Sequence, residues 1–146
     1  MDNMDSRIVE ILKENSRISA SEISRKVGLS VPAVSERIKK LEEQGVIQKY
    51  TIKLNEQILG YNIKAYIMVR LQDVDALPEF KEQILQFPNI LECHHIAGEF
   101  DYIMKTVVAS TDDLEDFITN KLKRIEGLSN CRTHLVFSTL KEELTI

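Results

Sequence analysis

The stretch SASEISRKVGLSVPAVSERIKKLEEQGVI, residues 19–47, predicts two short helices joined by a tight turn. Ser19 opens a capping box with the glutamate three residues on, so that the two side chains accept hydrogen bonds from free backbone amides. Gly28 follows at the position where a helix commonly ends in a left-handed residue. Ser30 caps the next helix, and Pro32 lies in its first turn, where the missing N–H breaks no helical hydrogen bond. The first third of the chain is therefore expected to be helical.

The second of these helices, expected from Ser30 to about Gln44, has one apolar face and one free face. At about 100° per residue, the apolar face carries Val31, Val34, Ile38 and Leu41, the free face carries Pro32, Ala33, Glu36, Lys39 and Lys40, and the flanks carry Ser35 and Arg37. Small and basic residues on a free face suit a helix that enters the major groove of DNA, which is about 12 Å wide. The pattern favours a DNA-binding helix-turn-helix. A three-helix packing module that touches no DNA is the alternative.

The chain is acidic overall, with a net charge of −4, but its charge is unevenly distributed. Residues 1–55 carry ten Lys or Arg against eight Asp or Glu, whereas residues 56–146 carry nine against fifteen. The range from Arg25 to Lys53 holds seven basic and three acidic residues. A locally basic module on an acidic body is typical of a nucleic-acid-binding protein, and a merely solvated surface is the alternative.

Two further elements complete this first domain. Upstream, Ile8, Ile11 and Leu12 have helical spacing, so we expect a helix that ends near Asn15. Asp2, Asn3 or Asp5 is its N-terminal cap. Downstream of Gly45, residues 46–54 alternate apolar and polar side chains through Tyr50, Ile52 and Leu54. Alternation of period two predicts a strand. We therefore assign residues 1–54 to a helix-turn-helix domain with a following strand.

Residues 63–146 contain two similar halves, each with the order strand, helix, strand. The first half is expected to have a strand at 63–71, a helix at 77–87 and a strand at 90–97, and the second half a strand at 101–109, a helix at 114–125 and a strand at 131–140. Two such units form a ferredoxin-like βαββαβ sandwich, an antiparallel four-stranded sheet with both helices on one face. The predicted fold class is α+β, with residues 55–62 as a linker that turns at Gly60.

Length and hydropathy bound the class of protein further. A chain of 146 residues with 43% hydrophobic content is long enough for one domain or two small ones. No run of about 18 apolar residues is present to span a bilayer, and the charged N-terminus lacks the apolar stretch of a signal peptide. We therefore expect a cytoplasmic protein with no membrane partner.

The sequence lacks the patterns of catalysis and metal binding. No GxSxG, P-loop or GxGxxG motif is present. His94 and His95 are adjacent in an expected strand, so they point to opposite faces and do not chelate one metal together. Cys93 and Cys131 lack the spacing of a zinc site or a disulfide framework. We expect free thiols, no catalytic residue, no metal and no cofactor.

The segment AGEFDYIMK, residues 97–105, has the features of a ligand loop. Gly98 permits a tight hairpin and the close approach of a ligand to the backbone. Asp101, at the entry to the next strand, has a carboxylate placed to accept from an amine. The alternative is a plain turn with an Asx-type hydrogen bond, and the residues taken alone favour that alternative.

Over essentially all 146 residues, the chain resembles the Lrp/AsnC family, the leucine-responsive or feast/famine transcription regulators. Residues 4–55 carry the resemblance in the first domain, and HHIAGEFDYIMK (94–105) and THLVFSTLK (133–141) carry it in the second. The resemblance implies a winged-type helix-turn-helix followed by a regulatory ferredoxin-like domain that dimerises through its sheet, often building octamers of four dimers. It also implies a small effector, usually an amino acid, bound in the cleft between dimers.

The resemblance assigns site residues in both domains. Ser30, Ser35, Arg37 and Lys40 match the family's DNA-reading helix, and the outward-facing Pro32, Glu36 and Lys39 complete the predicted DNA-binding set. Gly98, Glu99, Phe100 and Asp101 match the effector loop, and His134, Leu135 and Val136 match the part of the last strand that surrounds the effector. His134 replaces a residue that is more commonly aromatic or aliphatic, which leaves the identity of the effector open. Glu36 repels phosphate, yet it can accept from a cytosine amino group or orient a neighbouring arginine.

We therefore expect a nucleoid-associated, sequence-specific transcription regulator that binds double-stranded DNA as a homodimer or a higher oligomer such as an octamer, with an amino acid as effector. A second hypothesis is an enzyme. Haem-pathway decarboxylases of the sirohaem type resemble this family and bind a tetrapyrrole with histidines, for which His94, His95 and His134 are candidates. A third is a stand-alone interaction protein that modulates another regulator and needs no basic helix face.

Overall fold

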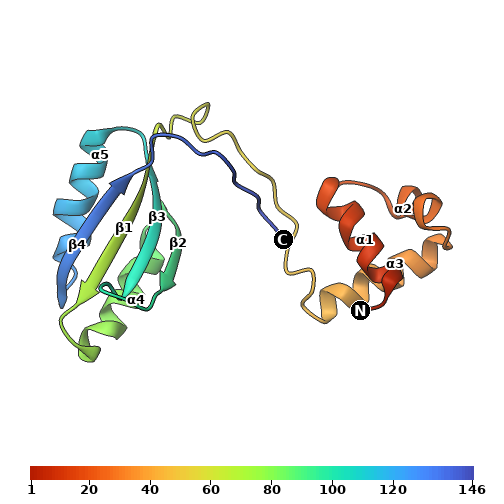
Figure 1. The fold of residues 1–146 in the computed structure, drawn as a ribbon, viewed down its shortest axis with the longest axis horizontal. Coiled ribbons are helices and arrows are strands. Elements are labelled where there is room, and N and C mark those ends of the chain that lie inside the picture. The colour runs from red at the N-terminus through yellow and green to blue at the C-terminus, as the bar shows by residue number, and fades with distance from the viewer. The chain divides into compact units, whose positions relative to one another are not determined.

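The structure, a computed structural model, describes residues 1–146, which divide into two compact units. One unit comprises residues 1–53 together with residues 143–146, and the other comprises residues 54–142. Figure 1 shows helices alone in the first unit and a sheet with helices in the second. No helix of the structure combines the length and the apolar character needed to cross a membrane.

The helical unit contains α1 (Asn3–Glu14), α2 (Ala20–Val27) and α3 (Val31–Glu43). The predicted capping box of α2 is confirmed: the Glu22 amide donates to the Ser19 hydroxyl, and the Ser19 amide donates to the Glu22 carboxylate. Gly28 ends α2 with a left-handed φ of 76°, and the Ser30 side chain accepts from the Ala33 amide to cap α3. The helix-turn-helix predicted from residues 19–47 is therefore confirmed.

A small apolar core holds the three helices together. Its buried side chains come from all three helices: Ile8, Ile23, Val27, Val34 and Leu41. Full burial of an aliphatic side chain of this size contributes about 1.5–3 kcal/mol. Val34 and Leu41 both belong to this core, so the rotation of α3 about its own axis is fixed. The same packing decides which side of α3 faces away from α1 and α2.

The strand expected at residues 46–54 is not formed. Tyr50, Ile52 and Leu54 alternate as predicted, but all three side chains are exposed, at 49%, 70% and 56%. A strand needs a neighbouring strand to pair with its backbone and a face on which to bury alternate side chains. No strand of the chain pairs with this segment, so the sequence pattern alone gives the wrong result.

The second unit has the predicted strand and helix order. It contains β1 (Ile63–Leu71), α4 (Leu77–Gln86), β2 (Ile90–His95), β3 (Tyr102–Val108), α5 (Thr111–Asp116) and β4 (Leu128–Leu135). The strands form one antiparallel sheet in the order β2-β3-β1-β4. This order confirms the ferredoxin-like architecture and the α+β class.

One face of the sheet is covered and the other is not. Ile67 and Val69 of β1 pack in one cluster with Phe80 of α4 and with Leu114 and Phe117 at α5. Both helices therefore lie on the same face, as Figure 1 shows. The opposite face, which we call the open face, is the one that bears the polar side chains described below.

The helix expected at 114–125 is not a regular α-helix. After α5 the chain makes a π turn over Phe117–Lys121 and a 3-10 turn over Leu122–Arg124. The Leu122 amide donates to the Phe117 carbonyl, five residues back. A π turn adds one residue to the helical repeat. It lets Phe117 and Leu122, which are five positions apart, both face the core at 2% and 0% exposure.

The last strand begins and ends earlier than residues 131–140. β4 starts at Leu128, directly after Gly127, whose φ is +78° and where an added Cβ would overlap Ala76. At the other end, the Val136 amide donates to the Lys64 carbonyl, next to the start of β1. No backbone hydrogen bond joins a residue after Val136 to β1, and the chain leaves the sheet there.

Candidate DNA-binding helix and effector loop

The buried face of α3 dictates which side chains the helix presents to solvent. Val34 and Leu41 are 0% and 2% exposed. Six of the seven predicted DNA-binding residues are exposed: Ser30, Pro32, Ser35, Glu36, Lys39 and Lys40. We call Pro32, Glu36, Lys39 and Lys40 the outer face of α3, because they lie opposite the core. This face is free to meet a partner.

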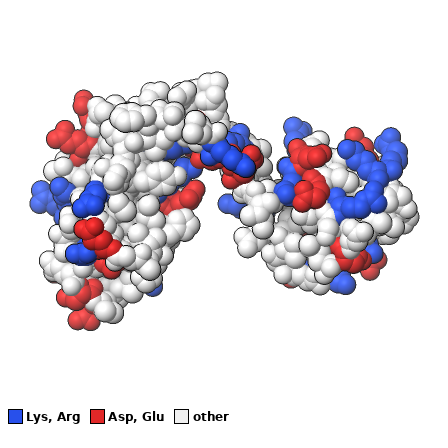
Figure 2. Space-filling view, in the orientation of Figure 1, with Lys and Arg blue, Asp and Glu red and all other residues white.

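The charges of the outer face are only weakly engaged within the chain. Lys39 forms a long ion pair of 3.5 Å with Glu43, and both side chains are largely exposed. Exposed pairs of this kind contribute little to stability. Lys40 and Glu36 form no hydrogen bond or ion pair. Figure 2 shows lysine and arginine side chains gathered over the helical unit at the right of the view, with acidic side chains among them.

Arg37 differs from its neighbours because it is bound within the helical unit. Its Nη1 atom lies 2.7 Å from Asp2 Oδ2 and 2.6 Å from Asp5 Oδ1. Asp2 and Asp5 form the capping box at the start of α1. Arg37 therefore fastens the flank of α3 to the first turn of α1, a role that the sequence did not indicate.

These contacts depress the pKa values of both carboxyls. The hydrogen bond from the Asp5 amide and the hydrogen bond from Arg37 lower the pKa of Asp2 from 3.8 to about 2. The hydrogen bond from the Asp2 amide and that from Arg37 lower the pKa of Asp5 as well. Both groups favour the folded state in their ionised form.

The predicted effector loop is the hairpin between β2 and β3, and it is bound to the end of β1. The Ile96 amide donates to the Asp101 carbonyl at 2.9 Å, and the Asp101 amide donates to the Val69 carbonyl at 2.9 Å. The Leu71 amide donates to Asp101 Oδ2 at 2.7 Å. One carboxylate oxygen of Asp101 therefore has a structural partner, whereas no hydrogen bond to Oδ1 is present.

Two arginines that the sequence analysis missed flank this loop. Arg70 Nε and Nη2 donate to the Glu99 carbonyl, the former at 2.7 Å, and Arg132 Nη2 lies 3.5 Å from Glu99 Oε1. The two guanidinium carbons lie 5.8 Å and 5.0 Å from the centre of the Phe100 ring, which is buried. Only the strand register brings Arg70 and Arg132 beside the loop, so no local sequence pattern identifies them.

The loop and the segment His134–Val136 do not meet within one chain. β1 pairs Val69 with Tyr102, next to the loop, but it pairs Tyr66 with His134. Three residues along a strand span about 10 Å. His134 and Leu135 are exposed and Val136 is partly buried. The two groups of predicted effector residues are therefore separate sites of a single protomer.

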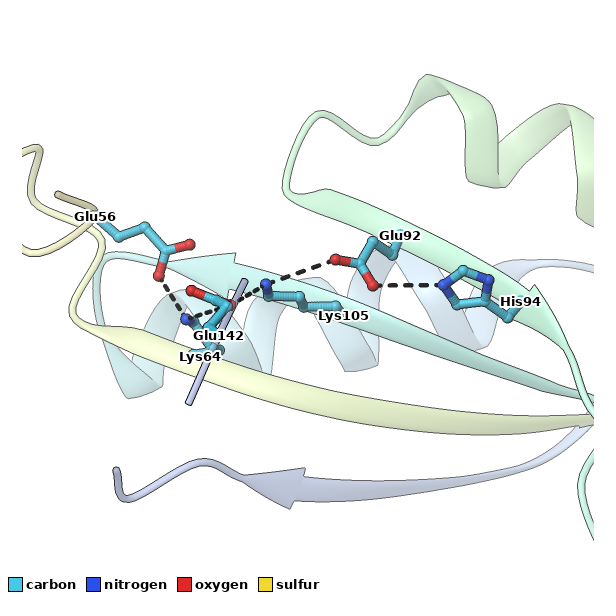
Figure 3. A network of polar contacts seen from close by, with 6 residues as sticks. All are labelled: Glu56, Lys64, Glu92, His94, Lys105 and Glu142. Atoms are coloured by element: carbon cyan, nitrogen blue, oxygen red, sulfur yellow. Dashed lines mark hydrogen bonds and ion pairs between the residues drawn. The ribbon is translucent and has the colours of Figure 1, made fainter. Parts of the chain in front are cut away.

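The open face of the sheet carries a network of ion pairs (Figure 3). Lys105 Nζ of β3 lies 2.5 Å from Glu142 Oε1 and 3.6 Å from Glu92 Oε1. Lys64 Nζ of β1 lies 2.9 Å from Glu56 Oε2 and 3.5 Å from Glu142 Oε1. Both lysine side chains are mostly buried. The two lysines therefore anchor the segments before β1 and after β4 to the sheet.

Lys105 is charged in this setting. Burial alone would lower the pKa of Lys105, but the hydrogen bond and charge of Glu142, with the charge of Glu92, outweigh it and raise the pKa. Breaking a buried pair by removing one partner leaves an uncompensated charge, which is strongly destabilising. The network is thus a structural feature of the open face.

No group of three or more His, Cys, Asp or Glu residues lies close enough to hold a metal ion. His94 lies 3.4 Å from Glu92, and the His95 ring stacks on Tyr102. A groove of about 550 Å³ lies between α1, residues 46–51 and residues 144–146, and it is lined by none of the predicted site residues.

Comparisons with known proteins match both units. A family model described as the Lrp/AsnC ligand binding domain matches residues 64–146, and one described as winged helix-turn-helix DNA-binding matches residues 1–48. The leucine-responsive regulatory protein of Haemophilus influenzae is 35% identical over 97% of this chain and 87% of the relative. The HTH-type transcriptional regulator FL11 of Pyrococcus furiosus is 32% identical over 97% of this chain and 93% of the relative.

Solved structures are similar over the whole chain. A transcriptional regulator of Neisseria meningitidis in complex with L-Met has a TM-score of 0.95 and 25% identity, covering 100% of this chain and 96% of that one. LrpC of Bacillus subtilis has a TM-score of 0.86 and 34% identity, covering 97% of each chain.

The depressed pKa values at the start of α1 generate a prediction on acid stability. A carboxyl whose pKa is lower in the folded state than in the unfolded state stabilises the fold fully above its unfolded pKa, near 3.8, and loses that contribution as the pH falls through its folded pKa. The helical unit should therefore lose stability between about pH 4 and pH 2. In Asp2→Asn this loss should be smaller.

Thermal unfolding of the two proteins, followed by circular dichroism across this pH range, measures the difference. Glu14→Gln is the matched control, because Glu14 lies on the same helix, is exposed and has no polar partner. Equal pH dependence in the original protein and in Asp2→Asn would show that the Asp2 contacts do not stabilise the fold.

Proposed function

The chain belongs to the Lrp/AsnC family of transcription regulators, and we propose that it binds specific sites on double-stranded DNA as a homo-oligomer that responds to an amino acid. The observation that carries the proposal is the outer face of α3. This face carries Lys39 and Lys40. It is exposed because the opposite face of the same helix is buried in the core. A helix held in this way can enter the major groove without unfolding.

The chain is a regulator rather than an enzyme. Its relatives are named transcriptional regulators, and the helix-turn-helix model matches its first 48 residues. The decarboxylase hypothesis is therefore set aside. The histidines that kept it open also lie on opposite edges of the sheet, with His94 and His95 on β2 and His134 on β4. The hypothesis of a stand-alone interaction protein gives no reason for the exposed basic face of α3.

The DNA-binding set divides by chemistry. Lys39 and Lys40 are suited to contact phosphates, because a cation that neutralises a phosphate releases the counterions bound to the DNA. Ser30, Pro32 and Ser35 are small, and they lie at or near the N-terminal half of α3, so they allow the backbone to approach base edges. Arg37 uses only Nη1 to hold α1, so its other donors can contact a phosphate while that contact stays in place. We propose that the protein acts in the cytoplasm, on the nucleoid, because its proposed target is chromosomal DNA.

For the effector, we propose that the loop of Gly98, Glu99, Phe100 and Asp101 binds an amino acid. Asp101 Oδ1 is available to accept from an α-ammonium group, and exposed loop amides are available for the carboxylate. The regulator of Neisseria meningitidis that resembles this chain was solved with L-Met, which supports an amino acid as the class of ligand.

We propose a homo-oligomer because the two groups of effector residues are separate within one protomer. The loop of one protomer and His134, Leu135 and Val136 of another can line one site only if two copies of the chain meet. A symmetric dimer would place its recognition helices about one helical turn of DNA apart, or a multiple of it, on a pseudo-palindromic site. Assembly into dimers, and further into octamers, would then be linked to effector binding.

The outer face of α3 generates a prediction on salt dependence. Lys39→Gln and Lys40→Gln should each weaken binding to all DNA sequences to a similar extent. Each should also reduce the slope of log affinity against log salt by about 1, because one phosphate contact is lost. Fluorescence anisotropy with a labelled fragment from upstream of the protein's own gene measures this slope.

Lys81→Gln is the control for these variants, since Lys81 is an exposed lysine on α4 in the other unit. If the Lys39 and Lys40 variants show the same slope of log affinity against log salt as the Lys81 variant, the outer face of α3 does not contact phosphate.

The loop generates a second prediction. Asp101→Asn keeps an oxygen that can accept from the Leu71 amide, but it loses the charge for an ammonium group. The variant should bind DNA as the original protein does, yet need at least about tenfold more amino acid for the same change in binding or assembly.

Sedimentation and DNA binding with a mixture of the standard amino acids, and then with each one, measure this response. Glu126→Gln removes an exposed carboxylate elsewhere in the same unit and serves as the control. An unchanged response in Asp101→Asn would argue that the ammonium group binds elsewhere.

A further inference from the structure

We propose that Glu36 accepts a hydrogen bond from the amino group of a cytosine in the major groove, and so sets the base preference of α3 at one position of the DNA site. This inference rests on the proposed sequence-specific binding of DNA. It concerns a carboxylate in the middle of a surface that otherwise attracts phosphate.

The position of Glu36 is that of a residue that meets base edges. At about 100° per residue, its side chain points about 160° away from that of Val34, which is fully buried. Pro32 and Lys40 lie one turn before and one turn after it on the same outer face. Glu36 belongs to the first half of α3, the half that contacts base edges in a helix-turn-helix.

The carboxylate of Glu36 is not used within the chain. Arg37, the candidate for an arginine oriented by Glu36, holds Asp2 and Asp5 instead. Lys39 pairs with Glu43, four residues on, rather than with Glu36. Lys40 has the helical spacing of a partner for Glu36, but no ion pair joins them. The alternative of an arginine-orienting role thus has no support in the contacts of α3.

An unpaired carboxylate at this place is unfavourable towards phosphate, so it needs a hydrogen-bond donor on the bases. Two bases offer a donor in the major groove, cytosine at N4 and adenine at N6. Adenine also presents the N7 acceptor beside its amino group, and two acceptors repel each other. Cytosine presents its amino group with no acceptor of its own on that edge. A carboxylate therefore selects cytosine, and it rejects the other bases as well as the phosphate backbone.

The same chemistry makes a sharp test with Glu36→Gln. A glutamine amide both donates and accepts, and it pairs with N6 and N7 of adenine. Selection from a library of random double-stranded DNA should give one position that is C·G for the original protein and A·T for Glu36→Gln. At that position each protein should prefer its own base pair by roughly five- to hundredfold, and all other positions should be unchanged.

Two further variants complete the experiment. Glu43→Gln also removes an exposed carboxylate from α3, near its C-terminal end, and it should leave the selected sequence unchanged. Glu36→Ala should lose the preference at the one position and bind random DNA more tightly, because a negative charge facing phosphate is removed. Circular dichroism of all variants should be unchanged, since both glutamates are exposed.

The outcomes separate this inference from the proposed function on which it rests. Identical selected sequences for the original protein and Glu36→Gln would overturn the base-reading role of Glu36 while leaving sequence-specific binding in place. A position that changes but prefers a pair other than C·G in the original protein would overturn the assignment to cytosine. If the original protein selected no sequence at all, the proposed sequence-specific binding would itself fail.

Discussion

The burial of Val34 and Leu41 is the constraint on which the DNA-binding face depends. These side chains pack with Ile8 and Ile23 in one small core, so α3 cannot rotate about its axis without exposing them. Whatever lies opposite them is presented to solvent by the same packing. Lys39, Lys40 and Glu36 are thus available for DNA because of residues that never touch it.

The second unit is built on a sheet with one covered face. Its helices bury the side chains of β1 that face them, and its open face holds Lys64 and Lys105 with their carboxylate partners. Those partners include Glu56 before β1 and Glu142 after β4, so the two segments that lead to the helical unit start from fixed points on the sheet. The effector loop is fixed in a similar way, because Asp101 is hydrogen-bonded to the end of β1.

Much of this architecture was predictable from the sequence, because the caps and the apolar spacing act locally. Ser19, Gly28 and Ser30 mark the helix ends where the structure has them. The errors arise where non-local pairing decides the outcome. Residues 46–54 alternate like a strand but have no partner strand in the chain, and β4 is displaced because its register with β1 determines its ends. The role of Arg37 and the positions of Arg70 and Arg132 depend on contacts between residues far apart in the sequence, which spacing does not encode.

We have proposed that a helix held by this core recognises DNA under the control of an amino acid. Nuclease footprinting on the DNA upstream of the protein's own gene, at near-physiological salt and with and without a mixture of the standard amino acids, tests it most directly. We expect protection in blocks that repeat with the helical turn of DNA, and a change in the extent of protection when amino acids are added. Absence of protection under both conditions would contradict it.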